Sequence, residues 1–268
     1  GGEARVAGGS GRSGQGRLTW GGETAGGLDY LVSASGLQTH GQTLAFPDLA
    51  GAGVDTSAAR LRGESGSRLF ARLRTASWRA TLIHGERDRI VPTGSFATDF
   101  NDPAHRERDV FTLGELAADQ SLDAATTLHQ RLYFGHYAYR GNFPYTYPPY
   151  AINRDDVRGD WWGLEGRLVS RAWSDQRWTL GLEYRDNVRQ QQANQDVGLG
   201  CFGVGPDPCL DTRTRGRLFN AYAQDEISLT ARTRLTVGLR HDRSLGTWQH
   251  WSHRLGLVHD TEAHGLIK

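Results

Sequence analysis

An aromatic segment in the middle of the chain carries the side chains best suited to binding a ligand. It reads Phe-Pro-Tyr-Thr-Tyr-Pro-Pro-Tyr over residues 143–150, and an arginine follows at position 154. Rigid aromatic rings and arginines are the groups that recognition surfaces use as anchors. The alternative is a loop that its prolines stiffen and that packs only on itself. We predict contacts with a ligand, suited to an anionic chelate, from Phe143, Tyr145, Tyr147, Tyr150 and Arg154.

Two cysteines, Cys201 and Cys209, lie in a segment rich in glycine and proline. A disulfide between them would close a small loop, and such bonds persist in oxidising compartments, which include the bacterial periplasm and the cell surface. Two unpaired thiols or a partial metal site are the alternatives. The chain has no further cysteine to complete a zinc site, and the spacing differs from that of a Cys-x-x-Cys redox pair. We predict the disulfide.

Other arrangements that could support chemistry are weaker. Residues 9–14 match a dinucleotide-binding fingerprint, but that motif requires a strand before it and a helix after it. A strand pattern follows here, so a glycine-rich hairpin loop is the better interpretation. The ten histidines form no metal-binding motif, no Ser/His/Asp arrangement stands out, and a net charge of +1 gives no support for nucleic-acid binding. We expect no enzyme, cofactor, metal or nucleic acid.

Alternation of apolar and polar residues predicts the elements that position these groups. Residues 177–185 place Trp, Leu, Leu and Tyr on one face, and charged or small residues on the other. Long strands are predicted near 159–171, 177–189, 217–229 and 234–243. They exceed the ~5–6 residues of ordinary strands and reach the ~9–11 tilted residues that cross a bilayer.

The connections between the strands alternate in length. Short polar turns are predicted at residues 23–26, 74–77, 118–123, 174–176, 230–233 and 260–263. Long connections are predicted at residues 39–67, 87–108, 141–158 and 188–216. Outer-membrane barrels have this rhythm, with short periplasmic turns and long outer loops. No window has the ~20 apolar residues of a membrane helix, so the sequence predicts an all-β, antiparallel transmembrane β-barrel.

Several segments resemble the barrel of TonB-dependent receptors. Residues 218–226 (Leu-Phe-Asn-Ala-Tyr-Ala-Gln-Asp-Glu) lead through a short turn to residues 236–242 (Thr-Val-Gly-Leu-Arg-His-Asp), similar to a barrel hairpin of that family. Residues 161–165 and 180–186 resemble an earlier hairpin. Residues 253–258 resemble a Pro-Arg-Leu-Gly-Leu-Val strand, with histidine in place of the proline. The order and spacing of these segments together make the match, and the resemblance covers essentially the whole chain.

The resemblance implies a barrel of about 22 strands around a plugged lumen, of which this chain holds roughly twelve. Residues 1–268 would be a barrel domain that is incomplete at both ends and lacks the plug. The intact protein would be a receptor in the bacterial outer membrane, surrounded by lipid, that takes up a large, scarce ligand. The ligand implied first is a ferric siderophore, with cobalamin, haem, other metal chelates and glycans left open. The TonB inner-membrane complex would supply energy through the missing N-terminal region.

Two other classes of protein remain as alternatives. A passive porin, a barrel enzyme or another outer-membrane barrel would lack the plug, and a soluble secreted β-rich binding protein would need no detergent. Asp225 bears on the choice, because its register points it outward with Phe219, Ala221 and Ala223. A carboxylate there costs little near the periplasmic interface and more at the midplane.

Overall fold

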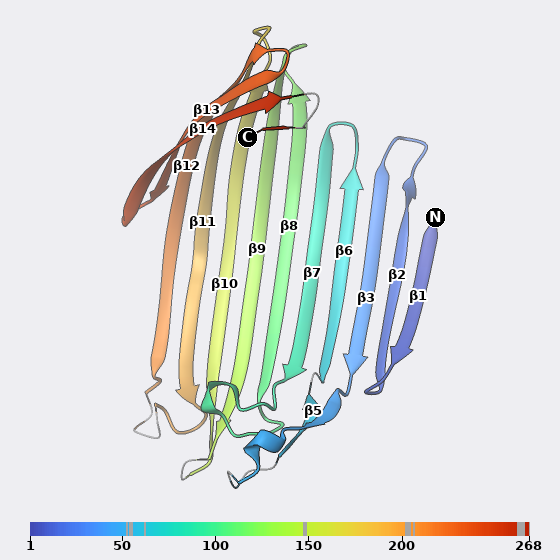
Figure 1. The fold of residues 1–268 in the computed structure, drawn as a ribbon, viewed down its shortest axis with the longest axis vertical. Helices are drawn as coiled ribbons and strands as arrows, with labels where there is room; N and C mark the ends of the chain where they lie inside the picture. Colours follow the sequence, from blue (N-terminus) through green and yellow to red (C-terminus); the bar gives the residue numbers. More distant parts are fainter. Residues whose placement is uncertain are drawn as a thin grey trace.

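Figure 1 shows the computed structural model, in which the chain folds almost entirely into strands. The structure describes residues 1–51, 53, 56–61, 63–146, 149–201, 205, 207–261 and 266–267. Thirteen strands form one antiparallel sheet: β1 (Gly2–Gly9), β2 (Ser13–Glu23), β3 (Asp29–Thr39), β6 (Glu64–Arg74), β7 (Trp78–Ile90), β8 (Arg106–Ser121), β9 (Thr126–Tyr145), β10 (Ala151–Ser170), β11 (Gln176–Asp196), β12 (Leu210–Thr230), β13 (Thr233–Ser244), β14 (Trp248–Asp260) and β15 (Leu266–Ile267).

The strands of this sheet follow one another as a meander, because each pairs with its neighbours in chain order. A two-stranded sheet, β4 (Gln42–Ala45) and β5 (Ser57–Leu61), interrupts the order within the connection after β3. Since β15 has only two residues, twelve long strands remain, which confirms the predicted number. The order runs from β1 to β15 without pairing these two strands, so the sheet that the described residues form is open.

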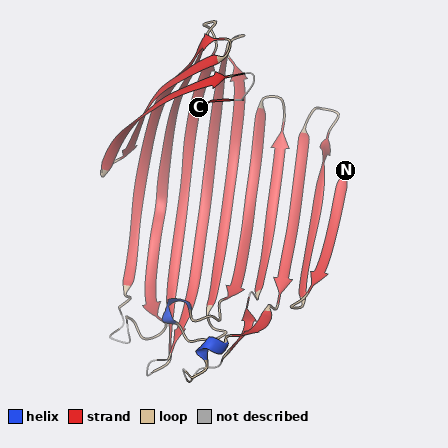
Figure 2. Cartoon of the chain, in the orientation of Figure 1, coloured by secondary structure: helices blue, strands red, loops and turns tan. Residues whose placement is uncertain are grey.

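Two short 3-10 helices, η1 (Pro47–Leu49) and η2 (Ser95–Ala97), lie beside the β4–β5 hairpin at the lower end of the sheet (Figure 2). Within the described ranges, no helix has both the length and the hydropathy to span a membrane. Residues 10–12 form the turn between β1 and β2, with a positive φ of 68° at Gly11. Glycine adopts this conformation without steric strain, and the predicted glycine-rich hairpin is confirmed.

The register of the strands sorts side chains onto two chemically different faces. The face that we call the apolar face carries one row across β8–β12 of Leu116, Leu132, Leu164, Tyr184 and Phe219. Many of these side chains are solvent-exposed in the isolated chain; Leu164, for example, is 52% exposed. A row of large apolar side chains that no other element covers is what a barrel presents to lipid.

The opposite face, which we call the polar face, is held by side-chain bonds that cross from strand to strand. Arg131 on β9 pairs with Glu115 on β8 (3.6 Å) and with Glu165 on β10 (2.8 Å). The hydroxyl of Tyr133 donates to Glu183 on β11 (2.9 Å). The predicted alternation of apolar and charged residues is therefore confirmed.

The predicted strand ends were wrong on the side of the long connections. The four predicted connections shrink to residues 40–63, 91–105, 146–150 and 197–209, because the strands continue well into them. Beyond the apolar rows both faces carry polar residues, so the alternation disappears although the backbone ladder continues. The strands therefore extend past the apolar rows only on this side, which we call the long-connection end.

Asp225 lies five residues before the end of β12, in register with Trp178 and Val237. It is 7% exposed, and among the described residues its Oδ1 atom has no hydrogen-bond partner. Ile227 and its register partner Leu235 continue the apolar face beyond it, so the carboxylate lies within the apolar rows, nearer to their turn end than to their other end.

Candidate functional site

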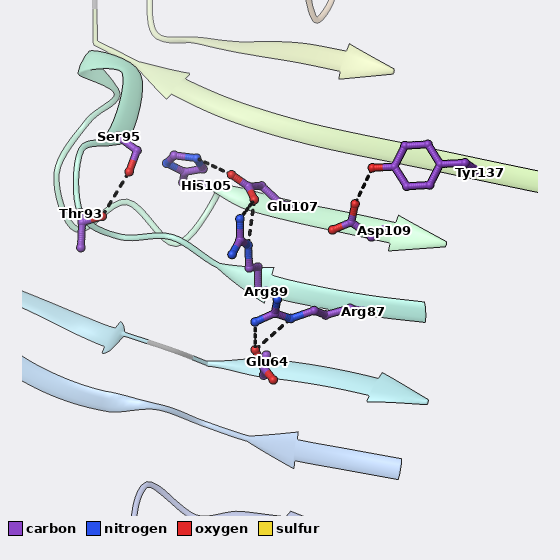
Figure 3. A network of polar contacts seen from close by, with 9 residues as sticks. All are labelled: Glu64, Arg87, Arg89, Thr93, Ser95, His105, Glu107, Asp109 and Tyr137. Carbon is purple, nitrogen blue, oxygen red and sulfur yellow. Dashed lines mark hydrogen bonds and ion pairs between the residues drawn. The ribbon is translucent and has the colours of Figure 1, made fainter. Parts of the chain in front are cut away.

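The polar face at the long-connection end carries charged side chains from three neighbouring strands and a tyrosine from a fourth (Figure 3). We call the following residues the loop-end cluster: Glu64 on β6, Arg87 and Arg89 on β7, Glu107 and Asp109 on β8, and Tyr137 on β9. The spacing of two residues puts both arginines on one side of β7 and both acids on the same side of β8. Antiparallel pairing of the strands then brings the opposite charges together.

The loop-end cluster is a chain of ion pairs. Arg87 donates from Nε to Glu64 Oε2 (3.0 Å), and Arg89 donates from Nε to Glu107 Oε2 (2.8 Å). In each pair a second guanidinium nitrogen also bonds the same carboxylate. Glu107 is buried (6% exposed), whereas about two fifths of each arginine side chain remains exposed (47% and 41%). The guanidinium groups can therefore reach a ligand while their carboxylate partners stay in place.

A fully buried histidine, His105, fixes the connection between β7 and β8 to this cluster. Its Nδ1 lies 3.0 Å from the hydroxyl of Thr98, and its ring lies against Phe143 on β9 (5.1 Å between centroids). Its Nε2 lies 3.9 Å from Glu107 and finds no hydrogen-bond partner within the described part of the chain. Burial lowers the pKa of His105; Glu107 and Asp102 oppose the shift, and Arg89 adds to it.

We expect acidification to loosen the connection of residues 91–105. A histidine whose folded pKa lies below its ordinary value stabilises the fold above that ordinary value, and this stability is lost as the pH falls. The protection of these amides against hydrogen exchange, corrected for the intrinsic exchange rate at each pH, should therefore be lower at pH 5 than at pH 7.5. In His105→Gln the difference between the two pH values should shrink, and an unchanged difference would show that another group causes it.

The predicted aromatic segment is mostly strand, which corrects the assignment of Phe143, Tyr145 and Arg154 to a loop. Phe143 and Tyr145 belong to β9, Arg154 belongs to β10, and Tyr150 lies in the short connection between them. Tyr147 lies outside the described residues. The strands continue here because their backbone ladder is unbroken up to the pair of Tyr145 with Ala151.

The structure brings only some of these five residues together. Phe143 is 6% exposed and packs edge-on against Phe96 (5.7 Å between centroids). Tyr145 donates to the carbonyl of Phe96 (3.2 Å), and Tyr150 donates to Asp102 Oδ2 (2.9 Å). Burial and the bond to Asp102 raise the pKa of Tyr150 to about 12. These tyrosines hold the connections 146–150 and 91–105 against each other.

Arg154 lies apart from the aromatic residues. Its register partner on β9 is Asn142, and its Nε donates to Asn142 Oδ1 (3.1 Å). Because successive residues of a strand point to opposite faces, Arg154 is on the face opposite Phe143 and Tyr145. A ligand held by these aromatic residues would not reach Arg154.

A disulfide joins Cys201 and Cys209, with the two Cα atoms 4.6 Å apart. It lies in the connection of residues 197–209 between β11 and β12, at the long-connection end.

The sequence interpretation missed the loop-end cluster because residues 87–108 were assigned to a connection. The available signal was the repeated spacing of two between like charges, at Arg87 and Arg89 and again at Glu107 and Asp109. Read as strand ends, these pairs predict two facing rows of opposite charge. The role of His105 could not be found this way, because its partners depend on how the connection folds back.

The arrangement suits anion binding rather than reaction chemistry. Guanidinium groups recognise carboxylates and phosphates through paired hydrogen bonds, and both arginines are positioned by acids on neighbouring strands. Across the part of the chain that the structure describes, no three histidine, cysteine or acidic side chains cluster as metal ligands. The cluster therefore presents two partly exposed guanidinium groups, held by carboxylates, at the rim of the sheet.

A family model described as TonB dependent receptor-like, beta-barrel, matches residues 42–266. The chain belongs to the TonB-dependent receptor family. This confirms the family that the sequence motifs indicated. No curated protein matches the chain.

Solved receptor structures share this fold. A mutant of the ferric enterobactin receptor PfeA from Pseudomonas aeruginosa aligns with a TM-score of 0.64 and 17% identity, over 93% of this chain and 39% of that one. The ferric citrate transporter FecA aligns with a TM-score of 0.64 and 13% identity, over 97% of this chain and 41% of that one. The ferric-catecholate import receptor Fiu from Escherichia coli aligns with a TM-score of 0.61 and 14% identity, over 95% of this chain and 50% of that one. The chain thus spans at most half the length of these receptors, and all of them are transport receptors rather than enzymes.

Proposed function

We propose that this TonB-dependent receptor chain forms part of the barrel domain of an outer-membrane receptor for a ferric chelate, most of all a ferric siderophore. Residues 1–268 would be one part of that barrel, and the TonB complex would energise release of the ligand into the periplasm. Family membership supports the barrel and its location, and it favours this function over a passive porin or a soluble secreted protein. The names of the structural neighbours support the ligand class.

The loop-end cluster is the observation that carries the proposal for this chain. Ferric siderophore complexes are commonly anionic, and Arg87 and Arg89 present half-exposed guanidinium groups on the polar face beneath the long connections. Each guanidinium has five N–H donors, so it can donate to a ligand oxygen while its bonds to Glu64 or Glu107 remain, and the buried carboxylate keeps its partner.

An exposed aromatic ring accompanies these cations. Phe96 in η2 is 76% exposed, and both Phe96 and Ala97 have left-handed backbone conformations with φ of 60° and 59°. Such conformations cost about 1–3 kcal/mol and concentrate at ligand-binding sites. The ring is therefore placed at the rim of the polar face, where it can pack on an aromatic or apolar part of the chelate.

Binding of ferric chelates to the full-length protein tests the proposal. Tryptophan quenching would be measured with ferric enterobactin, ferric citrate and a ferric hydroxamate. We expect one of them to bind, and Arg87→Gln with Arg89→Gln to weaken it by about tenfold or more, because each charged hydrogen bond contributes about 1.5–3 kcal/mol.

Arg79→Gln is the matched control, because Arg79 lies on the same face of β7 at the opposite end, paired with Glu115 (3.2 Å). The affinity of the Arg79→Gln variant for the ferric chelate should stay near that of the wild type. Binding of no ferric chelate would refute the proposed ligand class, and equal effects of both variants would refute the role of the loop-end cluster. Uptake of radioactive iron by cells with and without an active TonB complex tests the energy source.

A further inference from the structure

The apolar face ends in a border of aromatic rings on the side of the long connections. Phe134 pairs in register with Trp162, and Tyr184 pairs with Phe219. The rings of Trp162 and Tyr184 contact each other, with centroids 5.5 Å apart. Aromatic side chains of this kind mark the level of the lipid head groups in membrane barrels. The border therefore marks where the apolar face leaves the hydrocarbon.

Directly beyond this border, the same face becomes cationic. A hollow of about 620 Å³ across β7–β11, which we call the outward hollow, is lined by five arginines and two aspartates. The aspartates are Asp88 and Asp156, and the arginines are Arg106, Arg108, Arg140, Arg158 and Arg189. Arginine thus outnumbers acid within one depression of the surface.

Two of the five arginines have no acidic partner. Arg106 pairs with Asp88 (3.3 Å), Arg108 with Glu86 (3.0 Å) and Arg140 with Asp156 (2.7 Å). Among the residues that the structure describes, no ion pair neutralises Arg158 or Arg189.

Arg158 is exposed and makes no hydrogen bond within the described chain, and Arg189 bonds only the neutral side chain of Gln191 (3.0 Å). Since Gln191 is also the register partner of Arg158, the two unneutralised cations lie on adjacent strands within two residues of each other.

We propose that the outward hollow binds phosphate groups of the lipid leaflet that adjoins the long connections. The proposal rests on the outer-membrane location given above, but not on the identity of the transported ligand. Arg158 lies four residues beyond Trp162, which is about 13 Å along a strand and less along the membrane normal because barrel strands tilt. Long arginine side chains extend from such a position toward the head groups, and guanidinium groups bind phosphate with two parallel hydrogen bonds.

The position of the hollow distinguishes this partner from the transported ligand. The loop-end cluster lies on the polar face, whereas the outward hollow lies on the apolar face, so a ligand that crosses the barrel interior does not meet Arg158 or Arg189. A lipid head group stays at that level because its acyl chains occupy the apolar rows below. A soluble phosphate has no such anchor and should bind far more weakly.

Lipid binding by the full-length protein in detergent tests the proposal. The probes are diphosphoryl lipid A, lipid A from which both phosphates have been removed, and inorganic phosphate, with binding measured by native mass spectrometry and by thermal stabilisation. We expect preference for diphosphoryl lipid A, weakened about tenfold in Arg158→Gln/Arg189→Gln, since two charged hydrogen-bonding groups are lost. Arg171→Gln, in the turn after β10 at the opposite end, is the matched control and should bind as the wild type does.

Three results would overturn the proposal: equal binding of both lipid A forms by the wild type, unchanged binding by the double variant, or binding of inorganic phosphate as tight as that of the lipid. Ferric chelate binding is measured on the same preparations. If the wild type binds a chelate but shows no preference for diphosphoryl lipid A, the lipid site alone is refuted. A lipid preference without binding of any chelate refutes the proposed ligand class alone.

Discussion

Leu82→Arg is expected to destabilise the full-length protein in a bilayer by up to about 2–4 kcal/mol, because an arginine on the lipid side of a barrel is costly and the cost grows toward the midplane. Leu82 lies on the apolar face of β7, in register with Ala71 on β6 and Gly114 on β8. Neither of these register partners offers an acid to a guanidinium group at this position. The free energy of unfolding would be measured by denaturant titration in phospholipid vesicles.

Ile83 provides a matched control, because it is the next residue and points to the polar face. The two side chains are equally exposed in the isolated chain, at 36% each, so only their surroundings in the membrane distinguish them. Ile83→Arg should cost about 1 kcal/mol or less, as surface substitutions do. Equal losses for the two variants in vesicles would contradict the assignment of the apolar face to lipid.

The sequence predicted the strands best along the apolar rows. From residue 177 to residue 185 the alternation is strict because one face carries large apolar side chains and the other charged or small ones, and β11 has the expected faces. Beyond Asp186, polar residues such as Arg189 and Gln191 occupy the apolar face as well. Alternation cannot mark a strand that has water on both sides, so the strand ends were placed too early.

The candidate site was harder to predict because it depends on register. Arg89 and Glu107 are separated by a whole connection, and only the pairing of β7 with β8 brings them together. Aromatic content suggested Phe143, yet the fold of residues 91–105 buries it against His105. Composition can identify residues able to bind, but it cannot determine which of them a neighbouring connection covers.

Gly163→Ala is the second substitution with a large expected effect, because a tyrosine ring occupies the space over this glycine. Gly163 on β10 pairs in register with Tyr133 on β9, and a Cβ atom at position 163 would overlap the ring. Tyr133 is 8% exposed, its hydroxyl donates to Glu183 (2.9 Å), and the guanidinium of Arg131 lies 4.7 Å from its ring centroid. Displacement of the ring breaks these contacts together, with an expected loss of about 1–3 kcal/mol.

Two further pairs on the polar face follow the same arrangement, since Trp161 covers Gly135 and Tyr222 covers Gly181. Gly166 supplies the control on the same strand, because nothing lies within 4 Å of the position its Cβ would take. Gly166→Ala should therefore leave stability unchanged or raise it slightly, as removal of a flexible glycine from a strand does. An equal loss in both alanine variants would show that backbone conformation, and not the tyrosine ring, makes position 163 sensitive.

A double-mutant cycle with Tyr133→Ala separates the ring from other causes. If overlap with the ring is the reason, Gly163→Ala should cost about 1–3 kcal/mol in the wild type and almost nothing once the ring has been removed. The difference between the two costs is the coupling energy of the pair. Because the ring joins β9, β10 and β11 through Glu183 on the polar face, a large coupling would show that aromatic side chains seated over glycines, as well as lipid contacts on the apolar face, hold these strands in register.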